Sequence, residues 1–413
     1  MTAGRPATAR RLLMVAGEAS GDLHAARLLS ALRRRVPDLE AFGLGGDELR
    51  AAGLETLADS AEISVVGIVE VAKIYRRAKQ IFNMLLQAAD ERQVEAAVLV
   101  DFPDFNLRLA KQLHRRGIRV IYYISPQVWA WRRGRVKAIA RDVEEMLVLF
   151  PFEVDFYRQH GVDARHVGHP LVDEVPVLDQ AWQRGAPAGT DDEILTGGEP
   201  TSLALLPGSR PSEVRSLLPN MLGAARRIAA ARPTRCRLIQ APTIPSSLVD
   251  EIVAATPEAA DLELERVRSE RFRVVADAHL ALCASGTATV ETALLGTPML
   301  VLYRLKTTSY LLAKWLVDLP SFSMVNLVLG HARGEALDSE FRSHVVPELL
   351  QDATEPEHVA RLALELLDDP ARVDAMRGEL AKLRLALGER GASERAALAV
   401  VERFGWAAAE SAL

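Results

Sequence analysis

Residues 280–303 read LALCASGTATVETALLGTPMLVLY, and this stretch decides the fold. The apolar run that ends at Cys283 predicts a buried strand, and the small residues 285–287 predict a tight turn. A helix is predicted over 289–295, because a glycine and a proline follow and stop it. A helix that starts beside a strand end presents unpaired backbone N–H groups and partial positive charge, which suit a phosphate or diphosphate.

This turn carries the first candidate binding residues. Ser285, Gly286 and Thr287 would border the diphosphate, and Glu291, one turn into the helix, would accept hydrogen bonds from a ribose. Small residues also occur at such turns for close packing alone, so the binding interpretation needs a second observation. A second strand, turn and helix are predicted upstream in residues 202–214, SLALLPGSRPSEV.

Arg210 lies in the turn of this upstream segment. Its guanidinium is a planar, permanently charged fork that suits phosphate oxygens. A solvated arginine on an exposed loop is the alternative. Taken together, the two turns favour an anionic, nucleotide-like ligand.

Length and composition indicate an ordered globular chain of about two domains. The chain has 413 residues, 49% of them hydrophobic and 25% charged, with a net charge of -5. This balance gives no overall attraction to nucleic acid or membrane. Locally, residues 108–141 hold ten Lys or Arg and no Asp or Glu, which suits phosphates or anionic lipid headgroups. Solvated helix faces are the alternative, and no nucleic-acid recognition motif accompanies the charge.

The cysteines and histidines point to neither a disulfide scaffold nor a metal site. Cys236 and Cys283 lie far apart in apolar segments, which fits a reducing, cytosolic location. His166 and His169 sit at a predicted strand end, and the chain has no H-E-x-x-H pattern. We therefore predict no metal and no cofactor. The apolar segment near the N-terminus predicts a first strand and not a signal peptide, because it is short and soon followed by acidic residues.

Apolar runs alternate with helical patterns along most of the chain, which predicts an α/β fold of parallel sheets. Strands are predicted at 11–16, 41–44, 96–100, 119–124, 145–149, 202–206, 236–241, 262–266, 279–283 and 299–303. The alternation fails in a stretch rich in Pro, Gly and acidic residues. We predict an N-terminal domain over 1–173, a linker and loop over 174–200, a C-terminal domain over 201–384, and a final helix over 385–413 that packs back on the first domain.

Two turns of the first domain carry carboxylates. Asp101 follows strand 96–100, where it has no capping duty and would face a cleft, so it is the better general-base candidate. Asp104, three residues on, is predicted to be a helix N-cap. After the first strand, Glu18 and Ser20 are candidates for contact with a substrate hydroxyl, and capping of the next helix by Ser20 or Asp22 is the alternative.

Apolar residues recur at helical spacing between positions 68 and 85, flanked by basic residues. Such a stripe lies either in a membrane interface or in the core of the protein. Periodicity alone favours the core.

Ten segments, in order from residue 16 to 351, together resemble one family, lipid A disaccharide synthase. They are AGEASGD, VGIVEV, DFPDFN, SPQVWAW, FPFE, VGHP, LLPGSRxxEV, ASGTATVE, YRLK and VPELLQ. The resemblance implies two facing Rossmann-like domains of the GT-B glycosyltransferase type. It also implies that the C-terminal half holds UDP and the N-terminal half holds a lipid acceptor.

The resemblance implies an inverting transfer of 2,3-diacylglucosamine from its UDP form to 2,3-diacylglucosamine 1-phosphate. The products would be a β-1,6-linked disaccharide 1-phosphate and UDP. It further implies a peripheral location on the inner face of the cytoplasmic membrane of a Gram-negative bacterium, and it leaves room for a homodimer. A UDP-sugar epimerase of the same fold, or a noncatalytic UDP-sugar or lipid-binding protein, is the alternative function.

Residue by residue, the resemblance implies roles for matching positions. Asp101 matches the family's proposed base, and Arg210, Asn326 and Gln351 match polar residues that handle the donor. Val325 departs from the pattern, because relatives usually have proline there, and predicts a freer loop before Asn326. Membrane contact is implied for the region of Ile68, Val69, Val71 and Ile74.

Overall fold

The structure is a computed structural model of the 413-residue chain, and it falls into two compact units. Unit 1 comprises Met1–Pro170 with Glu389–Leu413, and unit 2 comprises Leu171–Gly388. The residues that the structure describes are 10–63, 71–130, 133–177, 200–305, 320–336 and 341–406.

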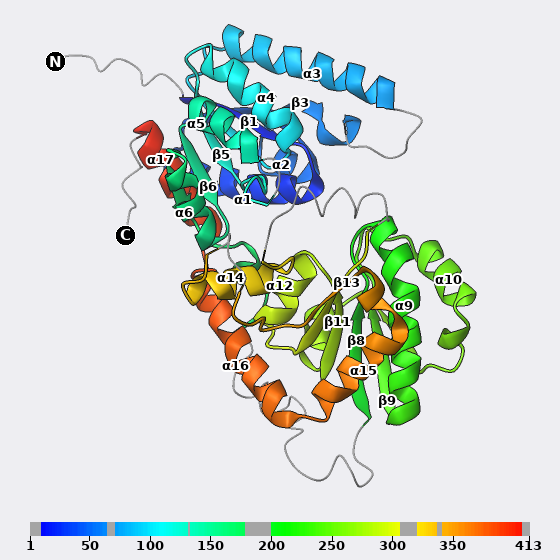
Figure 1. Cartoon of the computed structure of the whole chain (residues 1–413). Helices are drawn as coiled ribbons and strands as arrows, with labels where there is room; N and C mark the ends of the chain where they lie inside the picture. The colour runs from blue at the N-terminus through cyan, green and yellow to red at the C-terminus, as the bar shows by residue number, and fades with distance from the viewer. Residues whose placement is uncertain are drawn as a thin grey trace, which may run out of the picture. The chain divides into compact units, whose positions relative to one another are not determined.

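Unit 1 is built on a parallel sheet of seven strands in the order β3-β2-β1-β4-β5-β6-β7 (Figure 1). All the pairings are parallel. The strands are β1 Arg10–Ala16, β2 Leu39–Gly45, β3 Glu55–Asp59, β4 Ala96–Val100, β5 Arg119–Tyr123, β6 Glu145–Val148 and β7 Ala164–His166.

Helices cover both faces of this sheet, because successive side chains of a buried strand point to opposite faces. On β1, Leu13 and Val15 belong to one core cluster, and Leu12 and Met14 belong to the other. The first cluster includes side chains of α3, α4, α5 and α6, and the second includes side chains of α1, α2 and α17. The helices are α1 Ala19–Arg35, α2 Asp47–Ala51, α3 Val71–Glu91, α4 Pro103–His114, α5 Val136–Asp142, α6 Pro151–Gln159 and α17 Ala392–Phe404.

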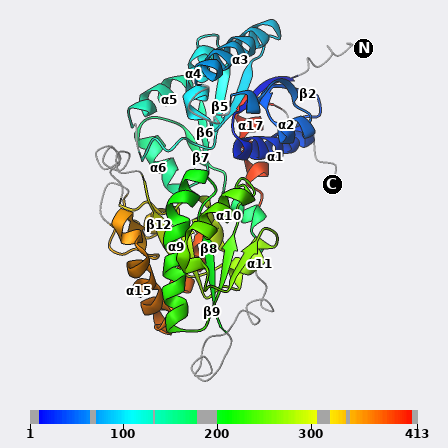
Figure 2. The same cartoon turned by 90° about the vertical axis from the view of Figure 1, so that its right-hand side faces the viewer.

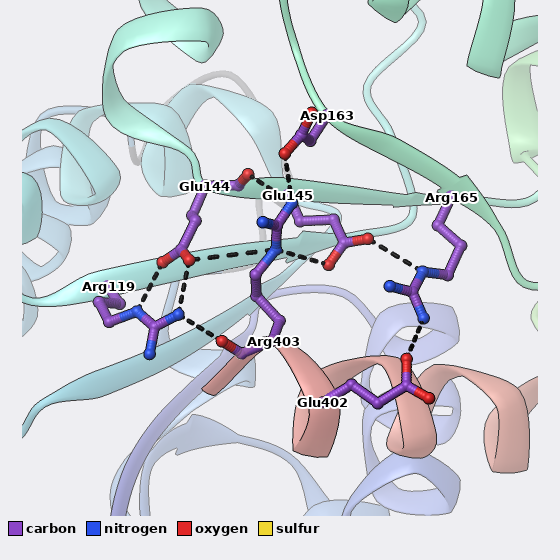
Figure 3. Close-up of polar contacts among 7 residues, drawn as sticks. All are labelled: Arg119, Glu144, Glu145, Asp163, Arg165, Glu402 and Arg403. Carbon is purple, nitrogen blue, oxygen red and sulfur yellow. Dashed lines mark hydrogen bonds and ion pairs between the residues drawn. The ribbon is translucent and has the colours of Figure 1, made fainter. Parts of the chain in front are cut away.

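A network of charged side chains joins α17 to the β5, β6 and β7 side of the sheet (Figure 3). Glu145, only 3% exposed, accepts hydrogen bonds at 3.0 Å from both Arg165 and Arg403. Arg165 also reaches Glu402 of α17 at 2.6 Å. A buried carboxylate is costly unless it is paired, so this contact fixes where the last helix packs. The network's members are Arg119, Glu144, Glu145, Asp163, Arg165, Glu402 and Arg403.

Unit 2 has a second parallel sheet, of six strands in the order β10-β9-β8-β11-β12-β13 (Figure 2). Helices α9 and α15 pack on each other, and α16 packs on α12 and α14. The strands are β8 Thr201–Leu206, β9 Thr234–Ile239, β10 Leu264–Val267, β11 Leu280–Ala284, β12 Met299–Tyr303 and β13 Glu348–Leu350. The helices are α7 Leu171–Glu174, α9 Pro211–Ala231, α10 Ser246–Ala255, α11 Arg271–Ala276, α12 Thr287–Leu294, α14 Met324–Ala332, α15 Pro356–Leu367 and α16 Pro370–Ala386.

The predicted α/β class is confirmed, and each of the ten predicted strands is present with ends that differ by two residues at most. Strands β3, β7 and β13 were not predicted. They are short, and each carries a charged residue that hides the apolar pattern. Of the predicted linker, residues 178–199 lie outside the described part of the chain.

The structure describes the side chains of only the second half of the predicted apolar stripe, in helix α3. Ile81 and Leu85 are fully buried in the core of unit 1, so the second half of the stripe is a core face. Ile68 and Val69 lie outside the described residues. Val71 and Ile74 lie in α3, but their side chains are not among those described. No helix in the described part of the chain is long and apolar enough to cross a membrane.

Candidate active site

Most of the predicted site residues lie in the turns and helix starts where the strand order of each sheet reverses, whereas Asn326 in α14 and Gln351 after β13 lie outside these points. In unit 1 this point lies between β1 and β4, and in unit 2 it lies between β8 and β11. Doubly wound sheets bind ligands at such switch points, outside the carboxyl ends of the strands. The turns after β1 and β4 carry Glu18 and Asp101, and the turns after β8 and β11 carry Arg210 and Gly286.

Asp101 stands in a strained turn that its neighbours hold in place. Both Asp101 and Phe102 have left-handed backbones, with φ of 47° and 51°, which costs non-glycine residues about 1–3 kcal/mol each. The Asp101 carbonyl accepts hydrogen bonds from the Tyr122 hydroxyl at 2.5 Å and from the Asn106 side-chain amide at 2.8 Å. These two donors, both from buried side chains, compensate the strain and hold the backbone of the Asp101 turn.

The Asp101 carboxyl is tuned toward proton transfer at neutral pH. Burial, and then the negative charge of Glu18, raise its pKa to about 6, while the backbone N–H of Phe102 opposes the shift. A general base works best when its pKa lies near the operating pH. The turn after β1 packs closely on Phe102, the neighbour of Asp101. A Cβ at Gly17 would lie 2.3 Å from the Phe102 ring, so only glycine fits there.

Three capping interpretations of the unit 1 turns are wrong. Helix α1 begins at Ala19 with Glu18 as N-cap, so neither Ser20 nor Asp22 caps it. The Asp22 carboxylate instead accepts from the backbone N–H of Gly46 at 2.6 Å and of Glu48 at 3.0 Å, which caps the neighbouring helix α2.

Asp104 is likewise not an N-cap. Phe102 takes that position in α4, because the left-handed backbone delays the helix start until Pro103. The Asp104 side chain is 69% exposed and pairs with Arg135. This pairing leaves Asp101 as the candidate base among the two acids of the turn.

The first turn of α12 forms the candidate anion site of unit 2. Helix α12 begins at Thr287, two residues earlier than predicted, and Gly286 precedes it with φ of 146°. The Ser285 backbone N–H donates to Leu302 at 2.9 Å, which anchors the turn to the end of β12. The Ser285 hydroxyl donates to the Phe322 carbonyl, also at 2.9 Å.

Two neighbouring helices already hold a carboxylate of the protein at their N-termini. Glu213 accepts from the backbone N–H groups of Ser209 at 3.1 Å and Arg210 at 3.3 Å, at the start of α9. Glu348 accepts from Phe322 and Ser323 at the start of α14. The first turn of α12 contains no acidic residue. Of the three, α12 is therefore the one whose N-terminal positive charge is left for an external anion.

Arg210 and Glu291 flank this N-terminus from different elements. Arg210 follows β8, which pairs directly with β11, and its side chain is 77% exposed with a 3.2 Å contact to Glu213. Glu291 is mostly buried, and burial raises its pKa although Arg271 opposes the shift. The two side chains are 3.3 Å apart, so Arg271 holds the Glu291 carboxylate in place.

Asn326 and Gln351 use their amides within unit 2. The Asn326 amide group donates to the Val346 carbonyl at 2.9 Å and to Glu348 at 2.6 Å, and its oxygen accepts from Val345 and Val346 at 2.8 and 3.0 Å. Gln351 accepts from the Leu305 N–H and donates to its carbonyl. Both amides therefore act on the protein's own loops.

The segment before Asn326 is not the freer loop that Val325 predicts. Val325 is fully buried and lies in the first turn of α14. The helical backbone and the burial of this side chain therefore hold the position in place. Four hydrogen bonds then fix the Asn326 side chain itself.

Four residues of these sites were not singled out from the sequence: Asn106, Tyr122, Arg271 and Glu348. Asn106 and Glu348 belong to two of the unusual segments, DFPDFN and VPELLQ, which is the signal that points to them. Tyr122 reads as an ordinary core residue of a strand. No group of three or more His, Cys, Asp or Glu that could hold a metal ion occurs in the described ranges.

Comparison with known proteins identifies the family. The family profile described as lipid-A-disaccharide synthetase matches residues 12–402. The chain belongs to this family. The lipid-A-disaccharide synthase of Myxococcus xanthus is 44% identical over 393 residues, covering 95% of this chain and 97% of that protein. The synthase of Syntrophus aciditrophicus is 41% identical over 389 residues, covering 94% and 96%. The matched span includes both units and every candidate site residue of the family motifs.

Several solved structures share the fold of this chain at low sequence identity. MurG of Acinetobacter baumannii superposes with a TM-score of 0.57 at 11% identity, covering 96% of this chain and all of that one. The UDP-GlcNAc 2-epimerase of Neisseria meningitidis, solved bound to UDP-GlcNAc, gives 0.59 at 10% identity and covers 95% and 99%. The calicheamicin glycosyltransferase CalG4 gives 0.54 at 15%, covering 95% and 98%. These likenesses establish the GT-B architecture and do not separate transferase from epimerase.

Proposed function

We propose that the protein is a lipid-A-disaccharide synthase that joins two acylated glucosamines. The donor is UDP-2,3-diacylglucosamine and the acceptor is 2,3-diacylglucosamine 1-phosphate. The products are the β-1,6-linked disaccharide 1-phosphate and UDP. Membership of the family supports the reaction, and the half-buried Asp101 with its raised pKa is the observation that carries the chemistry.

In this mechanism Asp101 takes the proton of the acceptor's 6-hydroxyl group. The hydroxyl oxygen attacks the anomeric carbon of the donor, and the bond from that carbon to the diphosphate oxygen breaks. The electron pair leaves with UDP, and the anomeric centre inverts in one displacement. Glu18 raises the pKa of Asp101 and so makes it a stronger base.

The N-terminus of α12 and Arg210 stabilise the departing diphosphate. Backbone N–H groups after Gly286 and the Arg210 guanidinium supply positive charge where negative charge develops in the transition state. Glu291 binds a ribose hydroxyl. Ser285 and Thr287 shape the turn, and Asn326 and Gln351 act on the loops beside it. Ser20 lies exposed in the first turn of α1, on the acceptor side.

The decisive assay mixes the purified protein with both diacylglucosamine substrates and identifies the products by mass. We expect one disaccharide 1-phosphate and one UDP per turnover. An epimerase would change the stereochemistry of the UDP-sugar without consuming an acceptor, and a binding protein would bind UDP without turnover. Either result would overturn the proposal.

We further propose that the protein works on the cytoplasmic face of the inner membrane, with α3 touching the lipid. Tyr75 is 65% exposed on this helix, and Arg76 and Lys79 are exposed beside it, which suits anionic headgroups. Replacing Val71 and Ile74 by Ser should weaken sedimentation with anionic vesicles. The control is Leu385→Ser, which changes an apolar residue that is 84% exposed on α16. Equal sedimentation of both variants would contradict the proposal.

The basic stretch 108–141 and the two cysteines both bear on the proposed location at the cytoplasmic face of the membrane. Arg116, Arg119, Arg135 and Arg141 are paired with acids, so the stretch presents less positive charge than its sequence indicates. Both cysteines are free and buried, as suits a reducing compartment. A homodimer stays a prediction that sedimentation equilibrium measures.

A further inference from the structure

One carboxylate of unit 2 collects four hydrogen bonds that lie outside the roles given so far. Glu348 Oε1 accepts from the Ser321 hydroxyl, from the Ser323 N–H at 3.2 Å and from Asn326 Nδ2 at 2.6 Å. Its Oε2 accepts from the Phe322 N–H at 3.0 Å. Ser321, Ser323 and Asn326 are buried. Every partner offers a donor, so both oxygens of Glu348 act as acceptors in this network.

The loop that Glu348 holds is joined to the candidate diphosphate turn. The carbonyl of Phe322 accepts from the Ser285 hydroxyl at 2.9 Å, and the Phe322 ring stacks on Tyr303 at the end of β12 with centroids 5.7 Å apart. A continuous path therefore runs from the carboxylate through residues 321–323 to Ser285, immediately before Gly286.

Glu348 is placed to act through this loop and not on the ligand. It begins β13 opposite Val301, two residues below the end of β12, and both of its oxygens are occupied by the protein. Asn326 continues the network with hydrogen bonds to Val345 and Val346. Three segments, at 285, 321–326 and 345–348, are thus tied together under the α12 N-terminus.

We infer that Glu348 is a positioning residue of the donor site, which sets the Ser285 turn for UDP through the loop 321–323. This inference rests on the proposed function, because that proposal places the diphosphate at Gly286. It also assigns Asn326 to the same loop-holding network in place of a direct contact with the donor.

The test is Glu348→Gln, which keeps the size of the side chain and places an NH₂ group against hydrogen-bond donors. A buried donor left without an acceptor destabilises the loop, so UDP affinity measured by calorimetry should fall roughly 10-fold. KM for the donor should rise in proportion while kcat changes less. The matched control is Glu365→Gln, an exposed carboxylate of α15 paired with Arg361, which should bind UDP as the wild type does.

A double-mutant cycle separates positioning from general loss of structure. If Glu348 acts through the turn, Glu348→Gln and Ser285→Ala together should weaken UDP binding by less than the product of their single effects. Glu348→Gln with Arg210→Ala should be multiplicative. Full independence of the first pair, or wild-type UDP affinity of a folded Glu348→Gln protein, would overturn the inference.

The remaining outcomes can be told apart. If Glu348→Gln does not fold, Ser321→Ala is the second variant, because it removes a hydroxyl that donates to Glu348 and accepts from the Ser323 N–H at 3.1 Å. It should weaken UDP binding about 2- to 5-fold, and wild-type affinity of this variant would overturn the inference. If the wild-type protein itself does not bind UDP, the proposed function falls and the inference falls with it. Wild-type UDP binding beside an unaffected Glu348→Gln protein removes the inference alone.

Discussion

The turn after β4 and the turn after β11 occupy the same place in two similar sheets, yet they are built in opposite ways. In unit 1, two non-glycine residues take left-handed backbones, and buried donors hold the Asp101 carbonyl. In unit 2, Gly286 allows the turn and the helix start carries no acid. A general base needs partial burial to raise its pKa, and the turn that places it there has to be held against backbone strain. An anion site needs only backbone N–H groups left without a carboxylate.

The strongest way to break the comparison is to remove the base alone. Asp101→Asn keeps the shape of the side chain but cannot accept a proton, so turnover should fall roughly 10²- to 10⁴-fold. Steady-state kinetics on both substrates would measure this, with UDP affinity unchanged. The control is Asp104→Asn, which weakens the pair of the exposed Asp104 side chain with Arg135 and should change stability by less than about 1 kcal/mol. Inactive Asp104→Asn beside active Asp101→Asn would reverse the assignment.

The same substitution should stabilise the protein in a pH-dependent way. The pKa of Asp101 rises from 3.8 to about 6 on folding, so the folded state holds this proton more tightly than the unfolded state. The free energy of unfolding therefore falls as pH rises from about 4 through 6, by at most roughly 3 kcal/mol at about 1.4 kcal/mol per pKa unit. Asp101→Asn should gain stability over wild type at pH 8 and little at pH 4. Thermal unfolding of both proteins at pH 4 and pH 8 measures this gain in stability. An equal gain at both pH values would argue against a raised pKa of Asp101.

The unit 2 turn can be disturbed through its backbone. A Cβ at Gly286 meets no atom within 4 Å, but φ of 146° disfavours any L side chain, at about 1–3 kcal/mol. Gly286→Ala should therefore weaken UDP binding about 10-fold. Gly296→Ala is the matched control, because Gly296 follows the other end of α12 with φ of 75° and equal open space. Both variants should lose stability, and loss of UDP affinity in both alike would contradict a role for the turn.

The smallest effect concerns the charge beside the base. Glu18 contributes to the raised pKa of Asp101, so Glu18→Gln should lower that pKa and shift the acidic limb of kcat/KM to lower pH. The wild-type limb should have an apparent pKa near 6. A pH–rate profile of both proteins measures the shift. A limb that stays in place would show that burial alone tunes Asp101.

The two sheets could be predicted from sequence because their strands are apolar runs of ordinary length. β4, for example, is AAVLV with every residue buried. The choice of Asp101 as candidate base could be made from its place at the end of this strand. The hydrogen bond that holds its turn could not be predicted, because Tyr122 lies 21 residues away and donates to a backbone carbonyl, which no local pattern reveals. Asp22 misled for the same reason, since it caps a helix 24 residues further on.

The hydrogen bond between Arg403 of α17 and Glu145 of β6 joins the end of the chain to the N-terminal unit, so unit 1 is complete only when the whole chain has been made. Unit 1 receives one of its covering helices, α17, only after all of unit 2 has been translated. Until then the nascent N-terminal sheet lacks the side chains of Ala396, Val400 and Phe404 against its second face. During translation this part of the sheet is therefore covered only after the rest of the chain has been made, and removing residues beyond 388 would expose the part of the face that α17 covers.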